Sequence, residues 1–150
     1  ELSIDLGCRN RAESVDGWWM IGIGHRLSSD EITAYVQDNI GWRRLSAPEI
    51  DAIYRADLMR AEKFLFNMIP YWKELDDARQ RAFLNIAFTS RDFCLSYYGR
   101  MQDFGKFLDA VDEQKWEEAV QLLQDTSGYH LISQPRADRI SHMLLTGESL

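Results

Sequence analysis

The stretch Gly17–His25 reads GWWMIGIGH and decides how the N-terminal part of the chain folds. Asp16-Gly17 at its start is typical of a tight turn, and the large apolar side chains that follow predict a strand over 18–23. Gly22 and Gly24 indicate a bend or a close backbone approach inside a small sheet. Further along, Thr33–Val36 favour another strand. The sequence therefore predicts a small β lobe near the N-terminus.

The clearest helix follows this lobe. Ser46-Ala47-Pro48-Glu49 matches a capping box, in which a serine hydroxyl and a glutamate carboxylate each accept from the other's backbone N–H. Apolar residues then recur at helical spacing until Pro70, so we expect a long helix over about 47–68. Asp57 lies within the apolar stripe of this helix and needs a partner there, because burying an unpaired charge is costly.

Shorter amphipathic segments follow the long helix, and the segment 89–100 between them is irregular and aromatic. We expect an α+β fold that is mostly α, with one domain over 1–150. In this domain, the long helix joins a hairpin lobe over about 12–45 to a helical lobe over about 70–150. The later helices are predicted over about 74–88, 104–111, 116–123 and 136–145, the last introduced by Pro135 and closed by Gly147.

The composition excludes several classes of function. The chain has 150 residues, a formal net charge of −7 and a hydrophobic fraction of 45%. An acidic chain is poorly suited to nucleic acid, whose binding depends on cationic contacts with phosphate, and its charge slows the approach to an anionic cell wall. No apolar stretch approaches the roughly 18 residues that cross a bilayer, so we expect no membrane span.

Cysteine and histidine spacing predicts no metal site and no cofactor. Cys8 and Cys94 lie far apart, so we expect buried free thiols, with one disulfide as the alternative and no structural zinc. The histidines at positions 25, 130 and 142 lack paired metal spacing. Gly22-x-Gly24 lacks the third glycine and the strand-then-helix setting of a dinucleotide loop.

The hairpin stretch resembles the Gly-Tyr-Tyr-Thr-Ile-Gly-Ile-Gly-His hairpin of T-even phage lysozymes. The resemblance continues in order through the capped helix with Asp57, then Arg79–Phe88, Lys115–Ala119 and Pro135–Arg139. It implies a two-lobed muramidase fold with a glycan cleft, in a phage-encoded or cell-envelope-facing protein. It also implies that Asp57 pairs with His25, as a structural contact between hairpin and long helix.

Compared with this family, the chain lacks the residues that catalyse glycoside hydrolysis. Glycoside hydrolysis needs a carboxylic acid and a second group that directs water or acts as the nucleophile. The family's acid is the Glu of Ile-Asp-Glu-Gly, and the corresponding residues here are Ile4-Asp5-Leu6-Gly7. Its second carboxylate corresponds to Ser14, and its water-positioning threonine corresponds to Met20. Leucine, serine and methionine at these three positions predict a loss of hydrolysis.

A relocated acid is the alternative to this loss. Glu13 and Asp16 lie in the loop where the second carboxylate belongs, and either would need a desolvated site to hold its proton. Arg136 matches an arginine that in the family pairs with the catalytic glutamate; without that partner it either binds a ligand carboxylate or points into solvent. The aromatic candidates for binding, which would otherwise pack a core, are Trp19, Tyr97 and Tyr98.

Two hypotheses from different classes remain. The first is a lysozyme-fold protein without glycosidase activity that binds peptidoglycan glycan or a protein partner. The second is an active muramidase that hydrolyses peptidoglycan with Glu13 or Asp16 as its relocated acid. The residues at positions 6, 14 and 20 and the acidic charge favour the first hypothesis.

Overall fold

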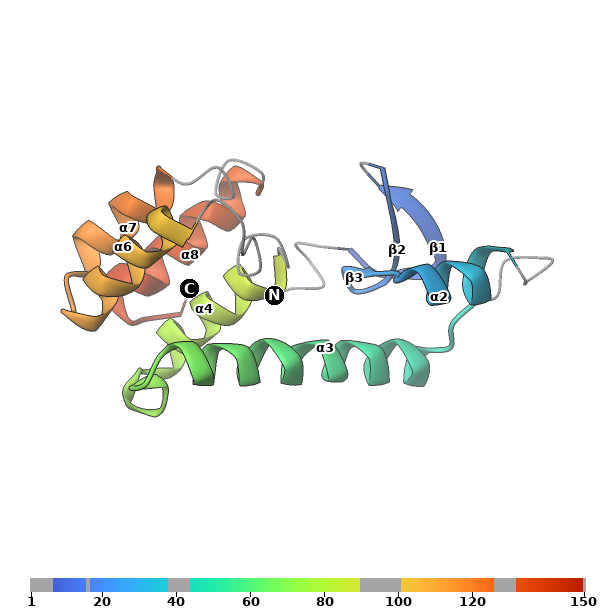
Figure 1. The fold of residues 1–150 in the computed structure, drawn as a ribbon, viewed down its shortest axis with the longest axis horizontal. Coiled ribbons are helices and arrows are strands. Elements are labelled where there is room, and N and C mark those ends of the chain that lie inside the picture. Colours follow the sequence, from blue (N-terminus) through green and yellow to red (C-terminus); the bar gives the residue numbers. More distant parts are fainter. Residues whose placement is uncertain (1–6, 16, 38–43, 90–100, 126–131, 150) are drawn as a thin grey trace. The chain divides into compact units, whose positions relative to one another are not determined.

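The computed structural model describes residues 7–15, 17–37, 44–89, 101–125 and 132–149 (Figure 1). These residues are mostly helical, with a small three-stranded antiparallel sheet near the N-terminus, which confirms the α+β, mostly α, class. The chain divides into two compact units, Glu1–Arg60 and Ala61–Leu150.

The sheet of the first unit contains β1 (Arg9–Val15), β2 (Trp18–Gly22) and β3 (His25–Arg26), in that order. The predicted strand over 18–23 is therefore present and ends one residue earlier. Gly22 and Gly24 have φ values of +58° and +67°, which side chains with a Cβ rarely adopt, so the expected bend lies between β2 and β3.

The strand expected over Thr33–Val36 is wrong. This segment lies in the π-helix η1 (Thr33–Gln37), which directly follows α2 (Ser29–Ile32). The reason is a capping box that precedes it. The Glu31 N–H donates to Ser28 Oγ at 3.3 Å, and the Ser28 N–H donates to Glu31 Oε1 at 3.1 Å. This start signal favours a helix over the β-branched composition of the segment.

The long helix is confirmed as α3 (Ala47–Met68). Its capping box is formed as the sequence predicts, because the Ser46 N–H donates to Glu49 Oε2 at 2.8 Å and the Glu49 N–H donates to Ser46 Oγ at 3.4 Å. The first part of α3 lies in the first unit, and its last residues lie in the second.

The second unit contains helices and no strand among the residues that the structure describes there. α4 (Asp77–Thr89) packs against α8 (Gln134–Thr146), and α7 (Trp116–Gln124) packs against both α6 (Met101–Asp112) and α8 (Figure 1). The last helix has Pro135 in its first turn and ends at Gly147 with φ +71°, as the sequence predicts. The short 3-10 helix η2 (Trp72–Glu74) lies between α3 and α4.

Each unit has its own apolar core. In the first, Ala12, Ile21, Leu27 and Leu45 are buried together, with side chains of α2, η1 and α3 packed against them. In the second, the core is larger, and Phe83 and Phe107 lie at its centre with ring centroids 5.7 Å apart. Burial of aromatic rings contributes a large share of the stability of such cores.

Cys8 is a free thiol and is exposed, so the expectation of burial is wrong for this residue. Cys94 lies outside the described residues. In the part of the chain that the structure describes, no helix is long and apolar enough to cross a bilayer.

Candidate functional site

The register of the sheet determines which hairpin side chains share a face. Glu13 of β1 is the partner of Met20 in β2, and Met20 is the partner of Arg26 in β3. Partners directly opposite each other in an antiparallel sheet project to the same side. Ile21, the neighbour of Met20, is fully buried in the core, so Met20 projects to the other side. We call Glu13, Met20 and Arg26 the outer row.

Ser14 projects to the opposite side of the sheet from the outer row. Its partner across β1 and β2 is Trp19, which packs against the core of the first unit. The two positions that resemble the family's second carboxylate and threonine, Ser14 and Met20, are therefore not brought together. Among the described residues of the hairpin, the carboxylate that shares a face with Met20 is that of Glu13.

Glu13 lies in solvent and forms an ion pair. Its side chain is 60% exposed, and its Oε2 lies 3.2 Å from Arg9 Nε. A carboxyl group that donates a proton to a glycosidic oxygen is held in a desolvated pocket, where its neutral form is favoured. The exposed side chain of Glu13 lacks such surroundings, so it does not suit the role of general acid.

The exposed aromatic residue of the hairpin is Trp18. It is 50% exposed, and the guanidinium of Arg26 lies over its ring, 2.9 Å from the centroid. Trp19, the binding candidate expected from the sequence, is half-buried on the core side instead. A cation over an indole ring holds both groups in place at the surface.

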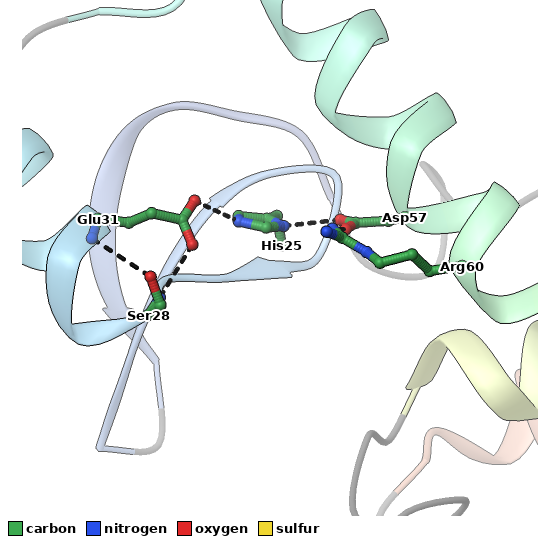
Figure 2. A network of polar contacts seen from close by, with 5 residues as sticks. All are labelled: His25, Ser28, Glu31, Asp57 and Arg60. Carbon is green, nitrogen blue, oxygen red and sulfur yellow. Dashed lines mark hydrogen bonds and ion pairs between the residues drawn. The ribbon is translucent and has the colours of Figure 1, made fainter. Parts of the chain in front are cut away.

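A second group of polar side chains surrounds His25 (Figure 2). The side chain of His25 is only 7% exposed, and both of its ring nitrogens contact carboxylates. Nδ1 lies 2.7 Å from Asp57 Oδ2, and Nε2 lies 2.7 Å from Glu31 Oε2. Arg60 donates to the other oxygen of Asp57. The structure thus brings together the pair that the resemblance implied, and Glu31 adds a third element. We call His25, Glu31 and Asp57 the histidine clamp.

The electrostatics of the clamp favour the charged form of each member. The hydrogen bond with Asp57 raises the pKa of His25 above 6.5 against the opposing effect of burial, and the bond with Glu31 adds to this rise. Burial by itself would raise the pKa of Asp57, but hydrogen bonds from His25 and Arg60 outweigh it and lower this pKa. In Glu31, burial is likewise outweighed by hydrogen bonds from Ser28 and His25, so that its pKa is lowered.

This arrangement does not suit catalysis by His25. A general base needs a free nitrogen lone pair, whereas an imidazole that donates to two carboxylates has none. The clamp instead ties β3 to α2 and α3 inside the first unit. Glu31 and Arg60 were not expected from the sequence. The Ser28-x-x-Glu31 spacing and the i,i+3 spacing of Asp57 and Arg60 were the signals that could have found them.

Arg136 lies in the second unit and does not point into solvent, so that expectation is wrong. It is 3% exposed, its Nε donates to Asn85 Oδ1 at 2.6 Å, and its Nη2 donates to the Asn85 carbonyl at 3.1 Å. Burial of the guanidinium between α8 and α4 requires such partners. Asn85 was also missed, because no local pattern in the sequence links it to a residue 51 positions away.

The remaining candidates, Leu6, Asp16, Tyr97 and Tyr98, lie outside the described residues. Among the residues that are described, no three histidine, cysteine or acidic side chains are grouped so that they could hold a metal ion. No protein-family model and no curated protein sequence matches the chain.

Proposed function

We propose that this chain is a lysozyme-fold protein that has lost glycosidase activity and binds an anionic glycan such as peptidoglycan through the outer row of its hairpin. The ordered motifs of the sequence support the fold, and the contact between His25 and Asp57 supports the same assignment. Because a fold hosts many functions, the functional part rests on the hairpin residues themselves.

The observation on which the proposal depends is the chemistry of the outer row. Met20 stands between Glu13 on one strand and Arg26 on the next. Methionine neither positions water nor moves a proton, and Glu13 is too exposed to serve as the acid. Hydrolysis needs both an acid and a second polar group, and the outer row supplies no suitable acid.

The alternative, an active muramidase with a relocated acid, would have to use Glu13 or Asp16. The solvent exposure of Glu13 argues against its use as the acid. An assay of peptidoglycan hydrolysis distinguishes the inactive protein from the active muramidase, whether the acid is Glu13 or Asp16.

The cationic and aromatic groups on the same face of the sheet as the outer row suit a glycan with carboxylate groups. Arginine recognises carboxylates through paired N–H donors, and Arg9 and Arg26 both lie on this face of an otherwise acidic chain. Trp18, held in place by Arg26, offers an exposed ring for stacking on a sugar. The charge of Arg26 locally reduces the repulsion that the net charge of −7 imposes on an anionic ligand, whereas the charge of Arg9 is balanced by Glu13.

The test is co-sedimentation with insoluble, purified peptidoglycan, combined with an assay for released reducing ends. We expect the wild-type protein to sediment and to release none. Arg26→Gln is expected to weaken sedimentation about tenfold, since it removes a charged contact and frees Trp18. Arg55→Gln is the matched control, because Arg55 is an exposed arginine of α3 that pairs with Asp51. Equal sedimentation of both variants would contradict binding through the outer row, and no sedimentation of the wild type would contradict glycan binding.

A further inference from the structure

The histidine clamp has more hydrogen-bond acceptors than a neutral histidine can satisfy. Both carboxylate oxygens lie 2.7 Å from a ring nitrogen, and both contacts are hydrogen bonds only when both nitrogens donate, that is, when the ring is an imidazolium. A neutral imidazole carries one N–H, and its other nitrogen is an acceptor. Loss of the proton therefore leaves one carboxylate facing a lone pair, at a side chain that is only 7% exposed.

The two hydrogen bonds of the clamp, His25–Asp57 and His25–Glu31, differ in how easily they break when His25 loses its proton. The Asp57 side chain is only 13% exposed and is also held by Arg60, so it has less access to water than Glu31. The Glu31 side chain is 35% exposed, and its other oxygen already accepts from the Ser28 N–H. Because hydration of Glu31 requires little movement, the hydrogen bond between His25 and Glu31 is the one that breaks.

The element that Glu31 belongs to is weakly held. α2 has four residues and no buried side chain among them, and its contact with the core comes from the half-buried Ile32. Short elements with few buried contacts open at a low free energy, well below that of the whole unit. η1, which directly follows, is anchored to the same core by Tyr35 and Val36, so the charged hydrogen bond to Glu31 acts mainly on the first turn, α2.

We propose that His25 is a proton-operated latch, which fastens α2 to the sheet when the imidazole is protonated and releases α2 when it is neutral. The charged groups of the described residues that face His25 are Asp57 from α3, with Arg60 behind it, and Glu31 from α2. Arg26, the next residue in β3, projects to the other side of the sheet. The latch is independent of glycan binding and goes beyond the proposed function.

The latch predicts a specific tautomer, which is read from the ring nitrogen shifts of His25 in a 15N NMR titration of the wild-type chain. Above its pKa, we expect neutral His25 to hold its proton on Nδ1, facing Asp57, and to leave Nε2 bare toward Glu31. The methyl resonance of Ile32 is expected to move toward its random-coil position with the same midpoint. The methyl resonance of Ile53, on α3 in the same core, is expected to stay in place.

Glu31→Gln tests the latch without removing the cap of α2, because glutamine also completes a capping box. In this variant we expect the Ile32 resonance to be independent of pH and the pKa of His25 to fall. His142→Gln is the control, and it is expected to leave both titrations unchanged. A neutral His25 with its proton on Nε2, or an Ile32 resonance that does not follow His25 in the wild type, would overturn the proposal even if the Glu31 variant failed to fold.

Discussion

Ser14 and Met20 project from opposite faces of the strand pair β1–β2, since Ser14 lies across from Trp19 and Met20 lies across from Glu13. The resemblance assigns the family's second carboxylate to position 14 and its water-positioning threonine to position 20. In this chain, their side chains are separated by the sheet. Putting back the family's residue types at positions 14 and 20 is therefore not equivalent to rebuilding a site.

This relationship predicts which substitutions create activity. Leu6→Glu with Met20→Thr supplies an acid and a water-positioning hydroxyl, and we expect it to release reducing ends from peptidoglycan above the level of the wild type. Adding Glu13→Gln is expected to abolish that gain, because Glu13 shares a face with position 20. Adding Ser14→Asp is expected to leave it unchanged. An equal effect of the changes at positions 13 and 14 would contradict the register.

Asp57→Asn is expected to lower the free energy of unfolding by about 3 kcal/mol, because it removes the charged partner of a buried imidazolium. Asp51→Asn on the same helix is the matched control. Asp51 pairs with Arg55, but both side chains are largely exposed, so the expected loss is below about 0.5 kcal/mol. Urea unfolding measures both, and equal losses would contradict a stabilising role of the clamp.

The clamp also predicts a stability maximum between about pH 4.5 and 6.5. Folding raises the pKa of His25, so the stability it adds is complete below its ordinary value of 6.5 and is lost as the pH rises through the folded pKa. Folding lowers the pKa of Asp57 and Glu31, whose ordinary values are 3.8 and 4.5. Their contribution is complete above these values and is lost as the pH falls through the folded pKa.

Urea midpoints between about pH 3 and pH 9 test this maximum. In His25→Gln the alkaline decline is expected to be smaller, since the group responsible for it is absent. An alkaline decline of unchanged size in this variant would assign the pH dependence to other residues.

Two glycines are expected to respond to alanine with opposite signs. Gly147 ends α8 with φ +71°, and a Cβ there would lie 2.9 Å from Arg79 Nη1, so Gly147→Ala is expected to cost about 1 kcal/mol or more. Gly105 lies inside α6, and an alanine Cβ at this position would have nothing within 4 Å. Gly105→Ala is therefore expected to stabilise the chain by about 0.5–1 kcal/mol. Thermal unfolding of both variants checks the signs, and a stabilising Gly147→Ala would contradict the C-cap.

Asn85→Ala is expected to destabilise the second unit by about 2 kcal/mol. The change leaves the buried Nε of Arg136 without its 2.6 Å acceptor, and hydrogen bonds to charged groups contribute about 1.5–3 kcal/mol. Asp138→Ala is the control, since its hydrogen bond with Gln134 is exposed on the surface of α8. Denaturant unfolding compares the two, and a loss in Asn85→Ala no larger than in the control would contradict the role of this contact.

The parts of the fold that depend on local signals could be predicted from the sequence. The ends of α3 follow from its capping box and from Pro70, and the ends of α8 follow from Pro135 and Gly147. The helix α2 has an equally local signal in the capping box of Ser28 and Glu31, and the strand expected over Thr33–Val36 overlooks it. In this segment the cap, not the composition, decides the structure.

The candidate site depends on contacts between distant residues, and these were harder to predict. The face on which Glu13 and Met20 meet follows from a register that is irregular between Arg9 and Glu13. The partners of His25 come from α2 and α3, and only Asp57 was expected from the sequence. The burial of Arg136 depends on the packing of α4 against α8, which no local pattern encodes.

The most direct test of the central claim is the release of reducing ends from purified peptidoglycan by the wild-type chain, beside Glu13→Gln and Asp16→Asn. The proposed loss of the acid predicts that all three release no more than a blank without protein. Release by the wild type that disappears in either variant would contradict the claim and would identify the acid of an active muramidase.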